Sequence, residues 1–154
     1  TINLGKWGVI NLTGKGAALL YKSDLDTPER IFQIGNNLDF DIKPNENVFF
    51  MSLNSYAYST SRRSASLFIE HDFQGLFLDR IPLINRLRLK ELLRYSMVCI
   101  PGSTPFTEVS FGLGNIGYKL FRILRVDIVH QFYEGKFKAS YFKVGLTASL
   151  GGGN

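Results

Sequence analysis

Hydrophobic and polar side chains alternate with a period of two along most of this chain. The clearest stretch runs from Ala139 to Leu150. One of its faces carries Ser140, Phe142, Val144, Leu146, Ala148 and Leu150, and the other carries Tyr141, Lys143, Gly145, Thr147 and Ser149. Successive side chains of a strand point to opposite faces. The alternation therefore predicts a strand with one apolar face and one small or polar face.

The same pattern predicts further strands upstream. They are Trp7 to Tyr21, Arg30 to Ile42, Asn47 to Thr60, Ser64 to Phe73, Asn85 to Ile100, Pro105 to Asn115 and Phe121 to Tyr133. The short polar link Glu134-Gly135-Lys136 predicts a hairpin between the last two strands. A helix over Ile81 to Leu93 is the alternative for one leucine- and arginine-rich stretch, although a turn at Arg80 to Leu83 followed by a strand fits better. About eight strands joined by mostly short turns predict an all-β, antiparallel, up-and-down sheet.

Two environments satisfy strands of this kind. In a soluble small-ligand-binding β-barrel the apolar faces point inward, whereas in a membrane barrel they point outward to lipid. Several strand candidates are roughly 12 to 15 residues long, which exceeds the ~5–6 residues of a typical soluble strand and covers the ~9–11 that a membrane strand needs. Aromatic residues also gather near the strand ends, as in interfacial girdles. These features favour a transmembrane β-barrel, with the soluble barrel as the alternative.

Composition narrows the function classes. The chain has 154 residues, which fits one domain over residues 1–154, and its net charge is +5. The charges are scattered, and no zinc-ligand spacing or nucleic-acid-binding motif accompanies them, so neither nucleic acid nor a metal or other cofactor is expected. The single cysteine, Cys99, excludes an internal disulfide. No stretch approaches the roughly 18 apolar residues of a membrane-spanning helix.

Two blocks of sequence resemble a known family. They are His71-Asp72-Phe73-Gln74-Gly75-Leu76-Phe77-Leu78-Asp79-Arg80-Ile81-Pro82-Leu83-Ile84-Asn85-Arg86-Leu87-Arg88-Leu89, and Pro105-Phe106-Thr107-Glu108-Val109-Ser110-Phe111-Gly112-Leu113-Gly114-Asn115-Ile116 followed by Leu120 to Asp127. They are similar to the C-terminal barrel region of Gram-negative outer-membrane proteins that carry a carboxypeptidase-like regulatory domain. Those proteins are related to the BamA-type surface-antigen barrels.

The resemblance implies a location and a set of partners. It places the chain in the cell outer membrane, as the C-terminal half of a larger, sixteen-stranded barrel. The implied role is structural or in membrane-protein assembly, as for BamA-type barrels. The implied partners are outer-membrane lipid and lipopolysaccharide, and other outer-membrane or periplasmic subunits are further candidates.

Three charged residues are candidates for a structural site inside such a barrel. The resemblance implies that Glu108 and Asp127 face the lumen and hold an arginine from an inward loop. Arg125 and Asp127 are two positions apart, so they share a face and could also pair directly. The chain contains no Arg-Gly-Phe or Arg-Gly-Tyr triplet, which is the inward-loop motif of BamA-type barrels. Simple hydration of these charges is the alternative.

A second group of candidates is basic. These residues could meet lipid head-group or lipopolysaccharide phosphates at a membrane boundary, or they could be ordinary turn and lumen charges. They are Arg62, Arg63, Arg86, Arg88 and Lys90.

No catalytic residue is expected, so the chain is predicted not to be an enzyme. An outer-membrane lipid-modifying enzyme would need a histidine, serine and glutamate arranged together. The period of two places His71 and Glu70 on opposite faces, and no serine lies in a nucleophile elbow. A lipid-modifying enzyme therefore remains the weaker of the two alternatives.

Overall fold

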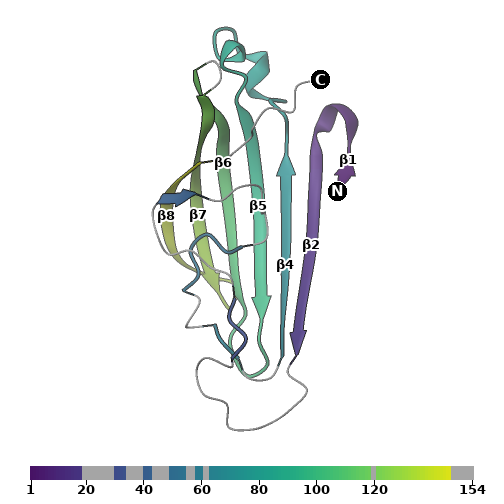
Figure 1. The fold of residues 1–154 in the computed structure, drawn as a ribbon, viewed down its shortest axis with the longest axis vertical. Helices are drawn as coiled ribbons and strands as arrows, with labels where there is room; N and C mark the ends of the chain where they lie inside the picture. Colours follow the sequence, from purple (N-terminus) through teal and green to yellow (C-terminus); the bar gives the residue numbers. More distant parts are fainter. Residues whose placement is uncertain are drawn as a thin grey trace.

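The fold is one curved β-sheet, seen in a computed structural model that describes residues 1–18, 30–33, 40–42, 49–54, 58–60, 63–118 and 121–146 (Figure 1). Its strands are β1 (Ile2–Asn3), β2 (Val9–Ala18), β3 (Phe40–Ile42), β4 (Arg63–Asp72), β5 (Lys90–Cys99), β6 (Phe106–Tyr118), β7 (Phe121–Tyr133) and β8 (Lys136–Leu146). Short 3-10 turns cover Gly5–Trp7, Leu78–Arg80 and Asn85–Leu87.

The strands lie in the order β1-β2-β4-β5-β6-β7-β8-β3. All neighbouring pairs are antiparallel except β3, which lies parallel to β8. The run from β4 to β8 is a meander of sequential neighbours. The predicted all-β, antiparallel class is therefore confirmed, and the up-and-down order holds for this run. Within the described residues β1 and β3 are the two outermost strands and do not pair with each other, so the sheet is not closed into a barrel.

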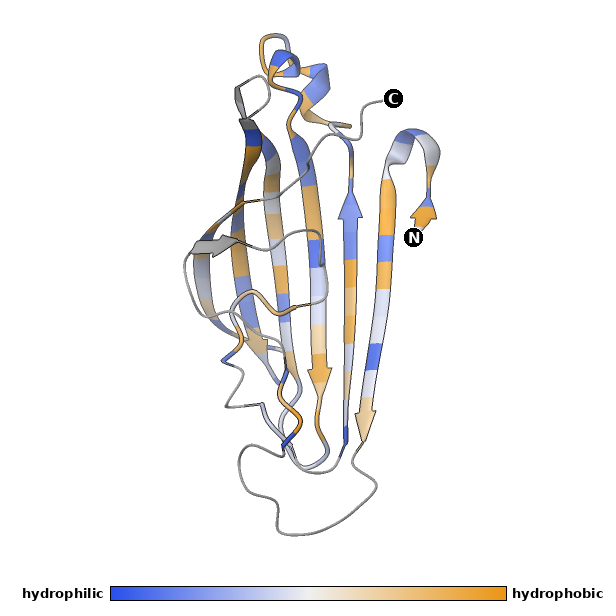
Figure 2. Cartoon of the chain, viewed as in Figure 1, coloured by the Kyte–Doolittle hydropathy of each residue, from blue (hydrophilic) through white to orange (hydrophobic). Residues whose placement is uncertain are grey.

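The pairing register aligns the two faces from strand to strand. Glu70 lies opposite Arg94, Ser96 opposite Glu108, and Gly112 opposite Asp127. We call the face that carries these residues the covered face. The alternate positions form the exposed face, and Figure 2 shows the resulting alternation of polar and apolar residues along the strands.

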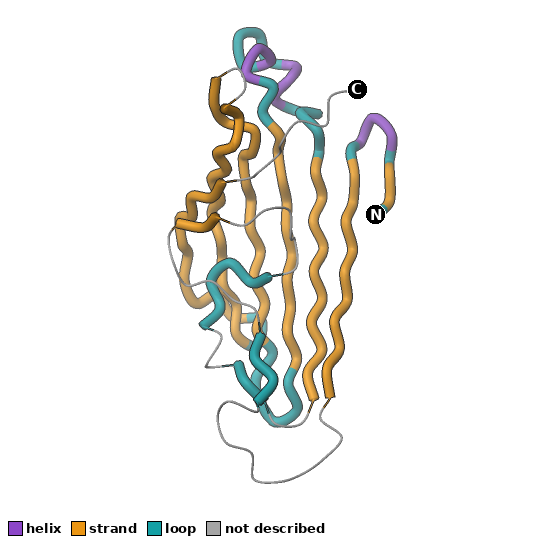
Figure 3. The backbone as a smooth tube through the Cα atoms, in the orientation of Figure 1, coloured by secondary structure: helices purple, strands orange, loops and turns teal. Residues whose placement is uncertain are grey.

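The predicted strand over Asn47 to Thr60 is wrong for its described part. Residues 49–54 and 58–60, which we call the inner segment, form no named strand and lie over the covered face (Figure 3). Aromatic and aliphatic side chains of this segment pack against the sheet in one apolar cluster. Its members are Phe50, Leu53, Tyr58, Phe68, Val98, Ile100 and Phe106. The members from this segment, Phe50, Leu53 and Tyr58, are three and five residues apart, so the packing does not follow the period of two from which the strand was predicted.

Other boundaries also differ from the predictions. The strand expected from Asn85 begins only at Lys90, because a 3-10 turn and the left-handed residue Arg88 precede it. The turn favoured over a helix at Arg80 to Leu83 is present. Of the strand predicted over residues 30–42, the described part contributes one bridge, Ile31 to Thr60, and the short β3. Residues 19–21 and 147–150, expected in strands, lie outside the described residues.

Candidate functional site

A chain of charged side chains crosses the covered face. Arg94 on β5 donates from Nε and Nη2 to Glu70 Oε2 on β4, at 3.1 and 2.7 Å. Arg125 on β7 donates from Nη1 to the same oxygen at 3.1 Å. Arg125 also binds Asp127 with two bonds, from Nε at 2.7 Å and from Nη2 at 2.8 Å. All four residues are at most 8% exposed. Two carboxylates and two guanidinium groups therefore form one buried, charge-balanced network.

The network joins strands that are not neighbours. Strands in a sheet lie ~4.8 Å apart, so β4 and β7 are about 14 Å apart along the sheet. The concave curvature of the sheet and the length of the Arg125 side chain close this gap. Between them lies Gly112 on β6, which lies opposite Asp127. A Cβ at Gly112 would overlap the Asp127 carboxylate, so the missing side chain makes room for the network.

We expect Gly112→Ala to lower the free energy of unfolding by about 1–3 kcal/mol, the usual range for overpacking. The added methyl group would collide with Asp127 and displace it from Arg125. Gly114→Ala is the matched control, because the nearest atom to its Cβ would be the flexible end of Leu92 at 3.3 Å, and the next would be at an ordinary contact distance of 4.0 Å. Urea unfolding of the two variants tests this, and equal losses would contradict it.

Glu108 anchors the inner segment from the middle of β6. Its Oε1 accepts the backbone N–H of Met51 at 2.7 Å, and its Oε2 accepts the Ser52 N–H at 3.1 Å and the Ser52 hydroxyl at 2.8 Å. Gln131 donates to the Ser52 carbonyl at 2.7 Å. A carboxylate that accepts several hydrogen bonds is a strong acceptor. Glu108 therefore replaces the strand partner that Met51 and Ser52 lack.

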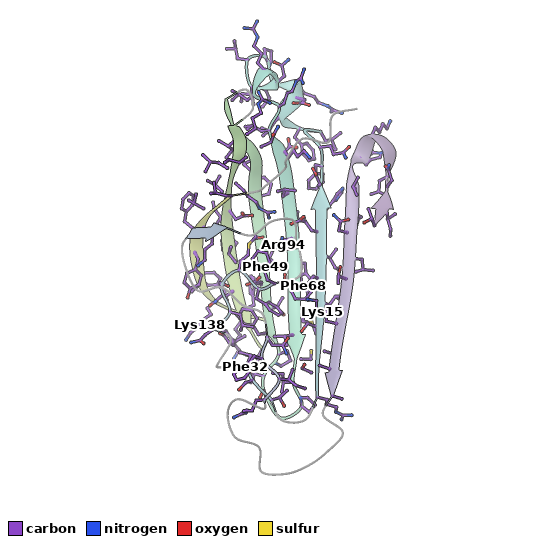
Figure 4. The ribbon with its side chains drawn as sticks, viewed as in Figure 1. Lys15, Phe32, Phe49, Phe68, Arg94 and Lys138 are labelled. Carbon is purple, nitrogen blue, oxygen red and sulfur yellow. The ribbon has the colours of Figure 1, made fainter. Side chains whose placement is uncertain are left out.

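Arginine and aromatic side chains add to this contact. The Arg94 guanidinium lies 5.0 Å from the centre of the Phe49 ring, and Figure 4 shows the two side by side near the middle of the sheet. Phe50 contacts Phe68 with ring centres 4.9 Å apart. The inner segment is thus held by both the charged and the apolar parts of the covered face.

We expect Glu108→Gln to loosen the inner segment while the sheet stays folded. An amide offers one oxygen acceptor in place of two, and its NH₂ group would face an N–H donor. Hydrogen exchange at Met51 and Ser52 should speed up by about tenfold, which corresponds to ~1.4 kcal/mol for weakened hydrogen bonds. Ser110→Ala, two residues along the same face, is the control. Unchanged protection at Met51 and Ser52 would show that Glu108 is not the anchor.

The structure brings together some predicted site residues and separates others. Glu108, Arg125 and Asp127 all lie on the covered face, and the direct Arg125–Asp127 pair is present. The described residues of the inner segment include no arginine, so the expectation of an arginine from an inward loop stays a prediction. The arginines of the network come from the strands themselves.

Sequence reasoning missed Glu70 and Arg94. Both lie at covered-face positions of their strands, so period-two alternation could have placed them beside Ser66 and Ser96. Their pairing depends on the register of β4 against β5, which brings the two residues opposite each other. The alternation within either strand does not specify that register.

The basic candidates lie at two ends of the sheet. Arg63 is exposed at the start of β4, next to the end of β2. Arg86, Arg88 and Lys90 are exposed at the other end, where Lys90 forms a loose ion pair with Asp72 at 3.6 Å. Arg62 lies outside the described residues.

The two histidines lie on the exposed face, away from the charged network. The ring nitrogen Nε2 of His71 contacts the Trp7 carbonyl at 2.8 Å, and Nδ1 of His130 contacts the Ser140 hydroxyl at 2.8 Å. No described carboxylate joins either pair. Among the residues that the structure describes, no group of three or more histidine, cysteine, aspartate or glutamate side chains could hold a metal ion. In the same part of the chain, none of the helical turns is long and apolar enough to cross a membrane.

These features define a class of protein: a single antiparallel sheet with a charged face covered by its own chain and an apolar face left open. The chain belongs to the family described as "Family of unknown function (DUF5686) C-terminal domain", whose model matches residues 1–113. No curated protein matches the chain, and no solved structure matches it either.

Proposed function

We propose that this chain forms part of the wall of an outer-membrane β-barrel, with a structural or membrane-protein-assembly role of the BamA type. In this role the covered face is turned to the lumen, and the exposed face meets lipid. The family description as a C-terminal domain agrees with a resemblance that puts a carboxypeptidase-like regulatory domain ahead of the barrel.

The observation that carries the proposal is that charged side chains are buried while large apolar side chains are exposed, the reverse of the arrangement in a soluble protein. Glu70, Arg94 and Glu108 are 5%, 2% and 1% exposed, whereas Phe111 is 50% and Ile128 48% exposed. The exposed face continues this apolar surface across several strands. Its large exposed members include Leu67, Leu93, Phe111, Leu124, Ile128 and Phe142. Contiguous apolar surface of this kind is rare on soluble monomers and marks contact with a membrane or another protein.

Strand length and aromatic placement support the same proposal. β2, β4 and β5 have 10 residues each, β8 has 11, and β6 and β7 have 13. A tilted membrane strand needs ~9–11 residues. Exposed aromatic side chains lie near both ends of the sheet, with Trp7 and Phe77 at one end and Phe137 at the other. Aromatic girdles at two interfaces have this arrangement.

The soluble ligand-binding barrel is not favoured by this geometry. In such a barrel the apolar faces line an enclosed cavity. Here the enclosed face carries the charged network and the inner segment, and the apolar face is open. The geometry likewise gives no specific support to a lipid-modifying enzyme, because the described histidines lie on the opposite face from Glu70 and Glu108.

Cell fractionation followed by gel electrophoresis tests the membrane proposal. We expect the full-length protein in the outer-membrane fraction, with a gel mobility that shifts on heating because a folded barrel resists the detergent. A protein that stays in solution without detergent and shows no shift would overturn the proposal.

Depletion of the protein separates the two proposed roles. An assembly role predicts that the folded, heat-shiftable forms of other outer-membrane barrels decrease before the cells lose viability. A purely structural role predicts that those proteins stay at their normal levels while only the properties of the envelope change.

A further inference from the structure

The connection between β4 and β5 carries an unusual set of exposed side chains. This β4–β5 loop, residues 73–89, lies at the end of the sheet marked by the two helical turns in Figure 1. Four large apolar residues of the loop are exposed. They are Phe77 at 56%, Ile81 at 44%, Leu83 at 75% and Leu87 at 49%. Exposed apolar residues this close together on a loop suggest contact with a nonpolar phase.

Hydrogen bonds and ring contacts fix the conformation of the loop, so its apolar side chains are held in exposed positions. The Glu91 carboxylate accepts the backbone N–H groups of Phe77 at 3.2 Å and Leu78 at 2.6 Å. Phe73 stacks on His71 with ring centres 4.0 Å apart and contacts Phe77 at 5.4 Å. By their place in the register, Glu91 and His71 belong to the exposed face. The loop therefore folds onto the end of that face and continues its apolar surface.

Cations lie among these apolar side chains. Arg80, Arg86 and Arg88 are exposed, and none of them forms an ion pair within the described part of the chain. Arg86, Arg88 and Lys90 line a hollow of about 890 Å³ together with Gln74, Asp79, Asn85, Leu89 and Asn115. Asn115 donates to the Arg88 carbonyl at 2.5 Å, and Arg122 donates to the Arg86 carbonyl at 3.4 Å. The side chains that line the hollow thus include three cations and one carboxylate.

We propose that the β4–β5 loop is a membrane-interface site that binds the phosphates of anionic phospholipid head groups. Leu83 and its apolar neighbours enter the boundary between head groups and acyl chains. Arg86 and Arg88 bind head-group phosphate oxygens, which guanidinium groups match with paired hydrogen bonds. This inference rests on the proposed membrane location and adds a lipid class and a site to it.

Depth-dependent fluorescence quenching tests the site. The full-length protein with Cys99→Ser, and with any other cysteine replaced, is reconstituted into vesicles of phosphatidylcholine with or without phosphatidylglycerol. One sample carries a probe at Leu83→Cys and a second carries it at Phe111→Cys, in the middle of the exposed face. Nitroxide lipids labelled near the head group or deep in the acyl chain serve as quenchers. Leu87→Cys replaces Leu83→Cys if the latter fails to show the heat-dependent gel shift.

The proposal expects the Leu83 probe to be quenched most by shallow nitroxides, and more strongly when phosphatidylglycerol is present. In detergent, Arg86→Gln combined with Arg88→Gln should weaken phosphatidylglycerol binding by about 10- to 30-fold, since each cation near an anionic surface contributes a factor of about five. Arg63→Gln, at the opposite end of the sheet, is the control and should leave that binding unchanged.

The other outcomes overturn separate claims. If the Phe111 probe is quenched and the Leu83 probe is not, the loop lies in water and the interface site is wrong, while the membrane proposal stands. If neither probe is quenched in protein that has folded, the membrane proposal itself fails. Equal Leu83 quenching with and without phosphatidylglycerol overturns phosphate binding. A response to lipopolysaccharide vesicles alone overturns the assignment of the bound phosphates to phospholipid.

Discussion

Glu70→Gln is expected to lower the free energy of unfolding by about 3–5 kcal/mol, the cost of removing one partner from a buried ion pair. The Glu70 carboxylate binds Arg94 at 2.7 Å and Arg125 at 3.1 Å. Both guanidinium groups are buried, so neither can turn to bulk water when the negative charge is removed. Urea unfolding of the protein in detergent micelles, followed by the heat-dependent gel shift, measures this loss.

Asp72→Asn is the matched control, two residues along the same strand. Its partner Lys90 lies 3.6 Å away and its side chain is 53% exposed, so the loss should be only about 0–1 kcal/mol. The double variant Glu70→Met with Arg94→Met should lose less than the sum of the two single variants, because it leaves fewer unpaired charges. A loss for Glu70→Gln no larger than for Asp72→Asn would mean that the network does not stabilise the fold.

Phe111→Arg is expected to lower the stability of the protein in vesicles by about 2–4 kcal/mol, the cost of an arginine at the mid-plane of a lipid-facing strand. Phe111 lies on β6 between Leu93 and Ile128 of the neighbouring strands, and all three side chains are exposed. On the surface of a soluble protein the same change would usually stay within about 0.5 kcal/mol. The size of the loss in stability therefore shows whether lipid or water surrounds this face.

Phe137→Arg supplies the depth control. Phe137 is 61% exposed and follows the turn between β7 and β8, where it would lie near the interface. An arginine there should cost about 0–1 kcal/mol, because the penalty falls toward the membrane boundary. Folding yields in vesicles of the two variants and of the conservative Phe111→Leu give the comparison. Equal, small losses for both arginine variants would indicate that the exposed face does not meet lipid.

The sequence predicted most of the sheet because strands with one covered face carry a strong local signal. The alternation in Ser64 to Asp72 and in Phe121 to Tyr133 correctly predicted strands and sorted their side chains to two faces. The same signal failed at Asn47 to Thr60. There Phe50, Leu53 and Tyr58 pack on the sheet at spacings of three and five residues, and the backbone N–H groups of Met51 and Ser52 bond to a carboxylate instead of a strand.

The candidate site was predicted only where its contacts are local. Arg125 and Asp127 are two residues apart on one strand, so their pairing follows from strand geometry alone. Glu70 reaches Arg125 across two intervening strands. That contact requires the register between the strands, the curvature of the sheet and the absence of a side chain at Gly112. No single stretch of sequence predicts these three conditions together.

The sequence by itself determined the secondary structure class and the two-faced character of the strands, because both depend on the period-two spacing of neighbouring side chains. The tertiary structure decided which face is covered. Alternation is unchanged when the two faces are exchanged, so it cannot indicate where the solvent lies. The inner segment settled this by binding Glu108 and packing on Phe68 and Phe106. It encloses the charges and leaves the apolar side chains of the other face open.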